Sequence, residues 1–172
     1  DSTGKVRLED LKKAVRPDTF LISIMYANNE VGTLQPIRSI GEWAREKGIL
    51  FHVDAVQALG AVPLDLANLP VDLMSFSAHK INGPKGTGAL YVAERVPLLP
   101  HIFGGSQERK RRAGTENVAG IVGFSAAVTL AVSRLQEKRA QMERLRTVML
   151  DTLTDALGED GFVVNGHETD RL

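Results

Sequence analysis

The chain has 172 residues, of which 43% are hydrophobic and 24% are charged. Such a composition is that of an ordinary globular protein, so disorder is excluded, and a chain of this length can bury a core without disulfides or metals. The 21 basic and 21 acidic residues cancel, which removes the bulk attraction to nucleic acids and membrane surfaces. There is no cysteine, so a disulfide framework, a thiolate metal site and a cysteine nucleophile are all excluded within this sequence.

Strand-like and helix-like segments alternate along the first half of the chain. A helix at 7–15 precedes a strand at 19–26, and a second helix opens at Pro36 and closes at Gly48. Further strands are predicted at 49–53, 71–77 and 88–92. This order predicts an α/β fold whose mainly parallel sheet is flanked by helices on both faces.

The second half is dominated by one helical pattern that runs from about 117 to 157. At ~1.5 Å per residue it would reach about 60 Å if straight, so we expect a kink or a bridge to another unit. Residues 162–167 read as one strand and a turn. We therefore expect residues 1–128 to belong to a large α/β domain. Residues 129–172 would be a long connecting helix and the start of a small domain, which makes the chain a central fragment.

Polar side chains follow three of the predicted strands. The carboxyl ends of parallel strands meet at one edge of a sheet, where α/β proteins bind their ligands. We therefore expect the fold to bring together six polar residues that are spread over fifty positions: Asn29, Asp54, Gln57, Ser77, His79 and Lys80.

Two of these residues suggest a specific chemistry. Lys80 follows an apolar strand, where a partly desolvated amine would be a competent nucleophile toward an aldehyde, although a solvated loop lysine is the commoner case. Asp54 ends another apolar strand, so its carboxylate would be at least partly removed from water and would need a cation or hydrogen bonds. A pyridinium nitrogen would be such a partner, and a turn-capping aspartate is an equally good interpretation.

The other candidates are individually weaker. Gln57 and Asn29 are amides that suit a phenolate or carboxylate oxygen, and Ser77 and His79 share one side of a strand end and both can donate to a phosphate. Thr115 precedes the long helix, where it could also meet a phosphate. The basic run at 109–112 favours a solvated loop or a local anion site over nucleic acid, and the histidines show no metal-ligand spacing, so we predict no metal site.

Four motifs, in order, carry a resemblance to a known family: YANNEVGTLQPI at 26–37, FHVDAVQALGAVPLDL at 51–66, SFSAHKINGPKGTGALYV at 75–92 and GGSQERKRRAGTENVAGIVG at 104–123. Together they resemble the cysteine desulfurases, pyridoxal 5'-phosphate enzymes of the class V aminotransferase group. The resemblance extends over nearly the whole chain.

The resemblance implies a role for each matching position. Lys80 is similar to the lysine that holds the cofactor covalently and later moves the proton, Asp54 to the partner of the ring nitrogen, and Gln57 to the ligand of the ring hydroxyl oxygen. The remaining implied contacts are with the phosphate, for Ser77 and His79, and with the substrate carboxylate and ring oxygen, for Asn29.

Thr115 is similar to a threonine that reaches the phosphate of the neighbouring subunit, which implies a homodimer with shared sites. Arg112 has no assigned role. The implied reaction removes sulfur from L-cysteine, leaves a persulfide on a cysteine of the enzyme and releases L-alanine. The acceptor would be an iron–sulfur scaffold or a sulfur-carrier protein.

The resemblance also implies parts that these residues lack. They are an upstream phosphate turn, a histidine that stacks on the cofactor, the catalytic cysteine and an arginine for the substrate carboxylate. Two alternatives remain open: a selenocysteine lyase or other class V enzyme, and a non-catalytic truncated homologue that serves as a dimerisation or scaffold partner. No apolar run reaches the length of a membrane span and the first residues do not form a signal peptide, so we expect a cytoplasmic protein with no membrane or nucleic-acid partner.

Overall fold

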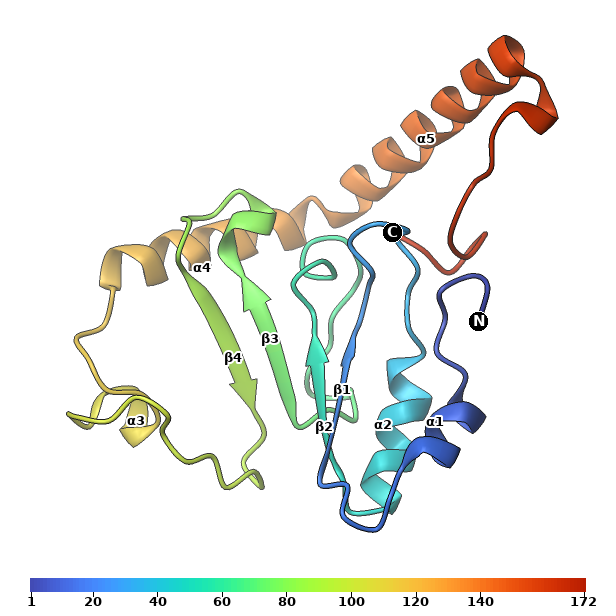
Figure 1. Ribbon diagram of the computed structural model, residues 1–172. Helices are drawn as coiled ribbons and strands as arrows, with labels where there is room; N and C mark the ends of the chain where they lie inside the picture. The colour runs from blue at the N-terminus through green and yellow to red at the C-terminus, as the bar shows by residue number, and fades with distance from the viewer.

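A four-stranded sheet organises the computed structural model, which describes residues 1–172 (Figure 1). The strands are β1 (Leu21–Met25), β2 (Leu50–Asp54), β3 (Leu73–Ser77) and β4 (Gly88–Val92), and they lie side by side in this order. The first three are parallel and β4 is antiparallel to β3. The mainly parallel α/β sheet predicted from the sequence is confirmed.

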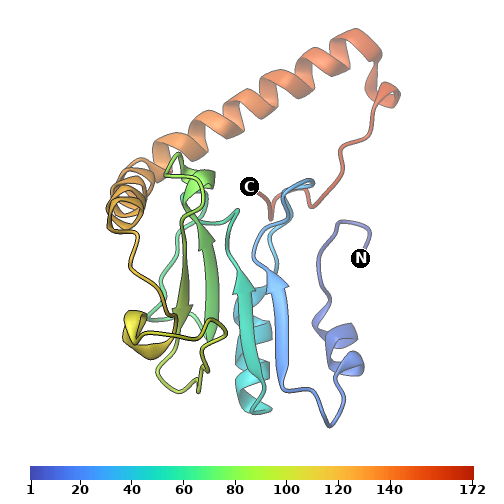
Figure 2. The ribbon, with the colours of Figure 1, turned by 60° about the vertical axis from the view of Figure 1, so that its left-hand side comes forward.

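One face of the sheet holds the hydrophobic core. Alternate residues of a strand point to the same face, and here the inward set includes Ile22, Phe51, Val53 and Met74, all buried. Helices α1 (Leu8–Ala14) and α2 (Ile37–Glu46) pack against this face (Figure 2). The α2 helix begins directly after Pro36, as predicted, and buries Ile37, Ile40 and Ala44.

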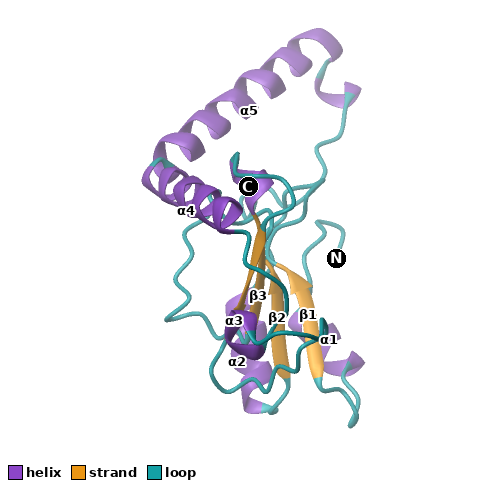
Figure 3. Cartoon of the chain, turned by 90° about the vertical axis from the view of Figure 1, so that its left-hand side faces the viewer, coloured by secondary structure: helices purple, strands orange, loops and turns teal.

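The opposite face is open to solvent. Leu21, Met25 and Leu90 point to it and are 38%, 39% and 48% exposed. The expectation that helices cover both faces is therefore wrong for this chain. The reason is the path of α4 (Val118–Ser133), which packs on the short helix η1 (Ala78–Ile81) at the end of β3 instead of lying along the open face (Figures 1 and 3).

The predicted long helix is broken in two. After β4 the chain passes through α3 (Gln107–Lys110), whose central residues turn in the left-handed sense, and then enters α4. Helix α5 (Leu135–Leu157) follows after Arg134 at an angle of 66°, which confirms the expected kink. The boundary predicted at 128 and 129 falls inside α4. Neither helix alone is long and apolar enough to cross a membrane, and α4 and α5 meet the length and composition criteria only as a bent pair.

The chain after α5 returns to the sheet. It passes through η2 (Glu159–Gly161) and runs back toward the N-terminus (Figure 1). The strand expected at 162–167 does not form, because this segment lies beside no other strand and Val163 is 83% exposed. Instead the segment attaches further on, where the backbone N–H of His167 donates to the Thr33 hydroxyl over 2.9 Å.

A buried aspartate ties together the end of the sheet opposite the polar strand ends. Asp72, at the start of β3, is 1% exposed and its Oδ2 atom accepts a hydrogen bond from the backbone N–H of Phe51 in β2 over 2.9 Å. Its Oδ1 atom lies 2.6 Å from Nη2 of Arg95, just beyond β4. A buried carboxylate is stable only when paired in this way, so Asp72 fixes β2 and β4 relative to β3.

We predict that Asp72→Ala lowers the free energy of unfolding by about 2–3 kcal/mol, because it leaves the Phe51 N–H buried without an acceptor. Asp72→Asn keeps an acceptor oxygen and loses only the pairing with the half-exposed Arg95, so it should cost about 1 kcal/mol. Urea denaturation of the full chain measures both values. Equal losses in the two variants would contradict this assignment.

Candidate functional site

The predicted polar residues gather at one edge of the sheet, where β1, β2 and β3 end. The parallel register places Met25 beside Asp54 and Asp54 beside Ser75, two residues before Ser77. The loop with Asn29, the turn with Gln57 and η1 with His79 and Lys80 all begin at this edge. Six of the seven candidates therefore lie at or just beyond the three strand ends that the parallel sheet aligns.

Asp54 closes β2 with its carboxylate on the open face. Its Oδ1 atom accepts a hydrogen bond from the backbone N–H of Val56 over 2.9 Å, which starts the turn that carries the half-buried Gln57. The Asp54 side chain is exposed. The expectation that the Asp54 carboxylate would be partly removed from water is therefore wrong for this chain. The carboxylate remains accessible to a cationic group.

Ser77, His79 and Lys80 form a compact group after β3. The Ser77 hydroxyl and Nδ1 of His79 are 2.8 Å apart, so the two side chains are held together at the end of β3. Lys80 lies one residue further along η1 and is exposed, so the expected desolvation of its amine is also absent from this chain. Asn82, the residue directly after η1, adopts the left-handed conformation with φ 62°.

Asn29 lies at the tip of the loop that follows β1. Its neighbour Asn28 shapes the loop, because Oδ1 of Asn28 accepts from the backbone N–H groups of Glu30 and Val31 over 2.8 and 2.9 Å. At the base of the loop, the buried Gln35 accepts from the Val6 N–H over 2.8 Å and donates to the Gly4 carbonyl over 2.7 Å. The exposed Asn29 side chain is thus presented by a loop that is held on both sides.

Thr115 is not part of this group. It is exposed in the connection between α3 and α4, which lies on the β4 side of the sheet, away from β1 (Figure 1). Its predicted contact is with a neighbouring subunit, and that contact stays a prediction.

One residue at the site was missed by the sequence-based reasoning. His52, two residues before Asp54 in β2, lies between two serines of the neighbouring strands: its Nδ1 atom is 2.7 Å from the Ser23 hydroxyl and its Nε2 atom 3.3 Å from the Ser75 hydroxyl. Partial burial lowers the pKa of His52, and the negative charge of Asp54 raises it by less. The available signal was the spacing, since Ser23, His52 and Ser75 each stand two positions before a strand end.

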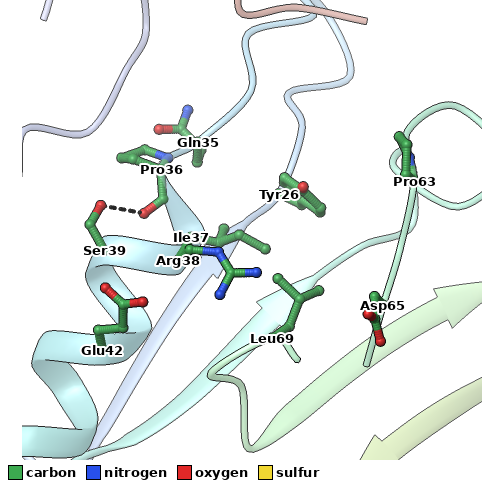
Figure 4. Close-up of a pocket in the computed structure, with 10 residues that line it drawn as sticks. All are labelled: Tyr26, Gln35, Pro36, Ile37, Arg38, Ser39, Glu42, Pro63, Asp65 and Leu69. Atoms are coloured by element: carbon green, nitrogen blue, oxygen red, sulfur yellow. Dashed lines mark hydrogen bonds between the residues drawn. The ribbon is translucent and has the colours of Figure 1, made fainter. Parts of the chain in front are cut away.

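A cavity of about 500 Å³ lies elsewhere, between the start of α2 and the segment 63–69 (Figure 4). Its charged residues are partly engaged: Arg38 donates to the Asn68 carbonyl over 3.1 Å, and Asp65 accepts from the Asn68 amide over 2.7 Å. Burial raises the pKa of Tyr26, which lines the same cavity. None of the seven candidates borders it, so we place the candidate site at the strand ends instead.

The donor set at the strand ends fits pyridoxal phosphate. The cofactor needs an anion for its ring nitrogen, donors for its phosphate and an amine for its aldehyde. Asp54 offers an accessible carboxylate, the Ser77–His79 pair offers adjacent hydroxyl and imidazole groups, and Lys80 offers a solvent-accessible amine. Asp54 and Ser77 are the last residues of adjacent strands and His79 and Lys80 follow directly, so the residues present suit this group.

Comparison with known proteins identifies the family. The aminotransferase class V family model matches residues 1–170, so the chain belongs to this family. This agrees with the parallel sheet and with the polar residues gathered at its edge.

Three relatives show which members of this family the chain is similar to. The chain is 50% identical over all 172 residues to the putative cysteine desulfurase IscS 1 of Bacillus subtilis, of which it covers 45%. A solved NifS-like protein superimposes with a TM-score of 0.87 at 50% identity, over 90% of this chain and 43% of that one. A structure described as SspA in complex with cysteine superimposes with a TM-score of 0.72 at 44% identity, over 75% of this chain and 38% of that one.

The similarity to cysteine desulfurases expected from the four motifs is thus confirmed. The chain spans less than half the length of these relatives.

We predict that His52 makes the stability of the chain sensitive to acid. Its folded pKa lies below its unfolded value of about 6.5. The unfolded state therefore binds more protons between these two values, and stability is lost as the pH falls from about 6.5 toward the folded pKa. Urea denaturation at a series of pH values should show a shallower loss in His52→Gln than in the wild type. Identical slopes would contradict the expectation.

Proposed function

We propose that the chain is the cofactor-binding core of a pyridoxal-phosphate-dependent cysteine desulfurase. Such an enzyme removes sulfur from L-cysteine, releases L-alanine and passes the sulfur on for iron–sulfur clusters or thiolated cofactors. The observation that carries the proposal is the placement of Asp54, Ser77, His79 and Lys80 at adjacent ends of parallel strands in a chain similar to desulfurases.

When bound, pyridoxal phosphate supplies an aldehyde that captures amines and a ring that accepts electrons. The chain's own residues would do the rest. The Lys80 amine would hold the cofactor through its aldehyde carbon and would carry the proton of the substrate Cα. The Asp54 carboxylate would keep a proton on the ring nitrogen, and the Ser77–His79 pair would donate to the phosphate.

The two amides complete the proposed set. Gln57 donates to the ring oxygen, and Asn29 donates to the same oxygen or to the substrate carboxylate. In a homodimer, Thr115 donates to the phosphate in the site of the partner. The thiol that takes the sulfur lies outside residues 1–172, which contain no cysteine.

L-Cysteine is the proposed substrate because the similar SspA structure is described as a complex with cysteine. The proposed sulfur acceptor is an iron–sulfur scaffold or a sulfur-carrier protein. The cytoplasmic location stays a prediction.

We predict that the full chain binds pyridoxal phosphate with an absorbance band at the violet edge of the visible spectrum. Borohydride should fix the pyridoxyl group to Lys80, because only an amine attached to the aldehyde carbon becomes a stable secondary amine on reduction. Mass spectrometry of the tryptic peptides locates the label. Lys80→Ala should lose both the band and the label.

The matched control is Lys85→Ala, which removes an exposed lysine from the glycine turn before β4 and should leave the band unchanged. A band that survives in Lys80→Ala would refute the role of Lys80. A band that shifts with L-selenocysteine and not with L-cysteine would instead favour a selenocysteine lyase.

A further inference from the structure

Three polar side chains form a hydrogen-bonded row across the open face of the sheet. Ser23 of β1, His52 of β2 and Ser75 of β3 each contribute one member, with separations of 2.7 Å from Ser23 Oγ to His52 Nδ1 and 3.3 Å from His52 Nε2 to Ser75 Oγ. We call this row the Ser–His–Ser row. The imidazole is the only one of the three groups that can reach both neighbouring strands at once.

The row lies next to the candidate site, two residues before the end of each strand. Ser23, His52 and Ser75 each lie two positions before Met25, Asp54 and Ser77, the last residues of their strands. Residues two apart share a face of a strand, so Asp54 points to the same face as His52. The register also pairs Asp54 with Ser75, so the row joins β2 to β3 beside the position of the carboxylate.

Electrostatics favour a neutral imidazole in this row. Asp54 is the charged group that acts on His52, and partial burial outweighs its effect, so the pKa of His52 is lowered. A neutral imidazole donates at one nitrogen and accepts at the other, which matches a hydroxyl on each side. A neutral imidazole also leaves the negative charge of Asp54 uncompensated, whereas an imidazolium would compete with any cationic ligand for that charge.

We propose that His52 is a positioning residue that, through the Ser–His–Ser row, fixes the Asp54 carboxylate for a protonated ring nitrogen. This inference rests on the proposed function, because it assumes that pyridoxal phosphate is the ligand of Asp54. It goes beyond that function by assigning a role to three residues that are not among the proposed cofactor ligands. The row holds β2 to both of its neighbours immediately before the site.

The test measures how much more tightly the full chain binds a ligand with a ring nitrogen than one with a carbon at the same position. The probes are pyridoxal phosphate and its 1-deaza analogue, in which a C–H group replaces the ring nitrogen. Dissociation constants are measured by equilibrium dialysis for the wild type, His52→Leu, His52→Gln and Asp54→Asn. The wild type should prefer pyridoxal phosphate, and Asp54→Asn should lose that preference.

His52→Leu removes both hydrogen bonds of the row and should reduce the preference about tenfold, while its affinity for the analogue changes less than about twofold. His52→Gln keeps a neutral amide that reaches one neighbouring serine, so it should restore part of the preference. Far-ultraviolet circular dichroism checks that the variants are folded, and the Gln variant keeps the test decisive if Leu disrupts folding.

Two results would overturn the role of His52. An equal loss of affinity for both probes would assign His52 a purely structural part, and an unchanged preference in His52→Leu would show that the row does not act on Asp54. A different result would refute the proposed function: a wild type that binds neither probe. The two failures are therefore seen in different variants.

Discussion

The parallel register of β1, β2 and β3 is the constraint on which the candidate site depends. It aligns Met25 with Asp54 and Asp54 with Ser75, so that three loops leave the sheet from one edge. A slip of one residue would exchange the two faces of a strand. In β2 it would bring the buried Val53 to the open face and drive Asp54 into the core. Burial of Phe51, Val53 and Met74 therefore fixes the chemistry at the edge as well as the fold.

The two ends of the sheet each carry an aspartate, and the two aspartates have different surroundings. At one end the carboxylate of Asp72 is buried, accepts a hydrogen bond from the Phe51 N–H and forms an ion pair with Arg95, which holds three strands together. At the other end Asp54 is exposed and engages only the turn that follows it. An aspartate thus stabilises the fold where its carboxylate is paired within the protein, and it is available to bind a ligand where its carboxylate stays accessible.

The sequence predicts much of this because parallel α/β topology converts local patterns into spatial neighbours. Strand ends found from hydrophobic runs bring Asp54, Ser77 and Lys80 to one edge. The approach fails where an element depends on a distant partner. Residues 162–167 have a β-rich pattern, yet no strand lies beside them. His52 reads as a lone histidine, because its two serine partners lie 29 and 23 positions away on other strands.

Two apolar surfaces of the chain, on helix α4 and on the open face of the sheet, are exposed. Helix α4 contains no charged residue, yet it buries only Gly120 and Ala127, and the face that carries Asp54 also exposes Leu21, Met25 and Leu90. A helix of this kind is normally buried. The proposed chemistry also needs a site from which water is excluded, because charges act on a bound ring far more strongly in a low dielectric. Met25, which the register places beside Asp54 on that face, would contribute to such surroundings.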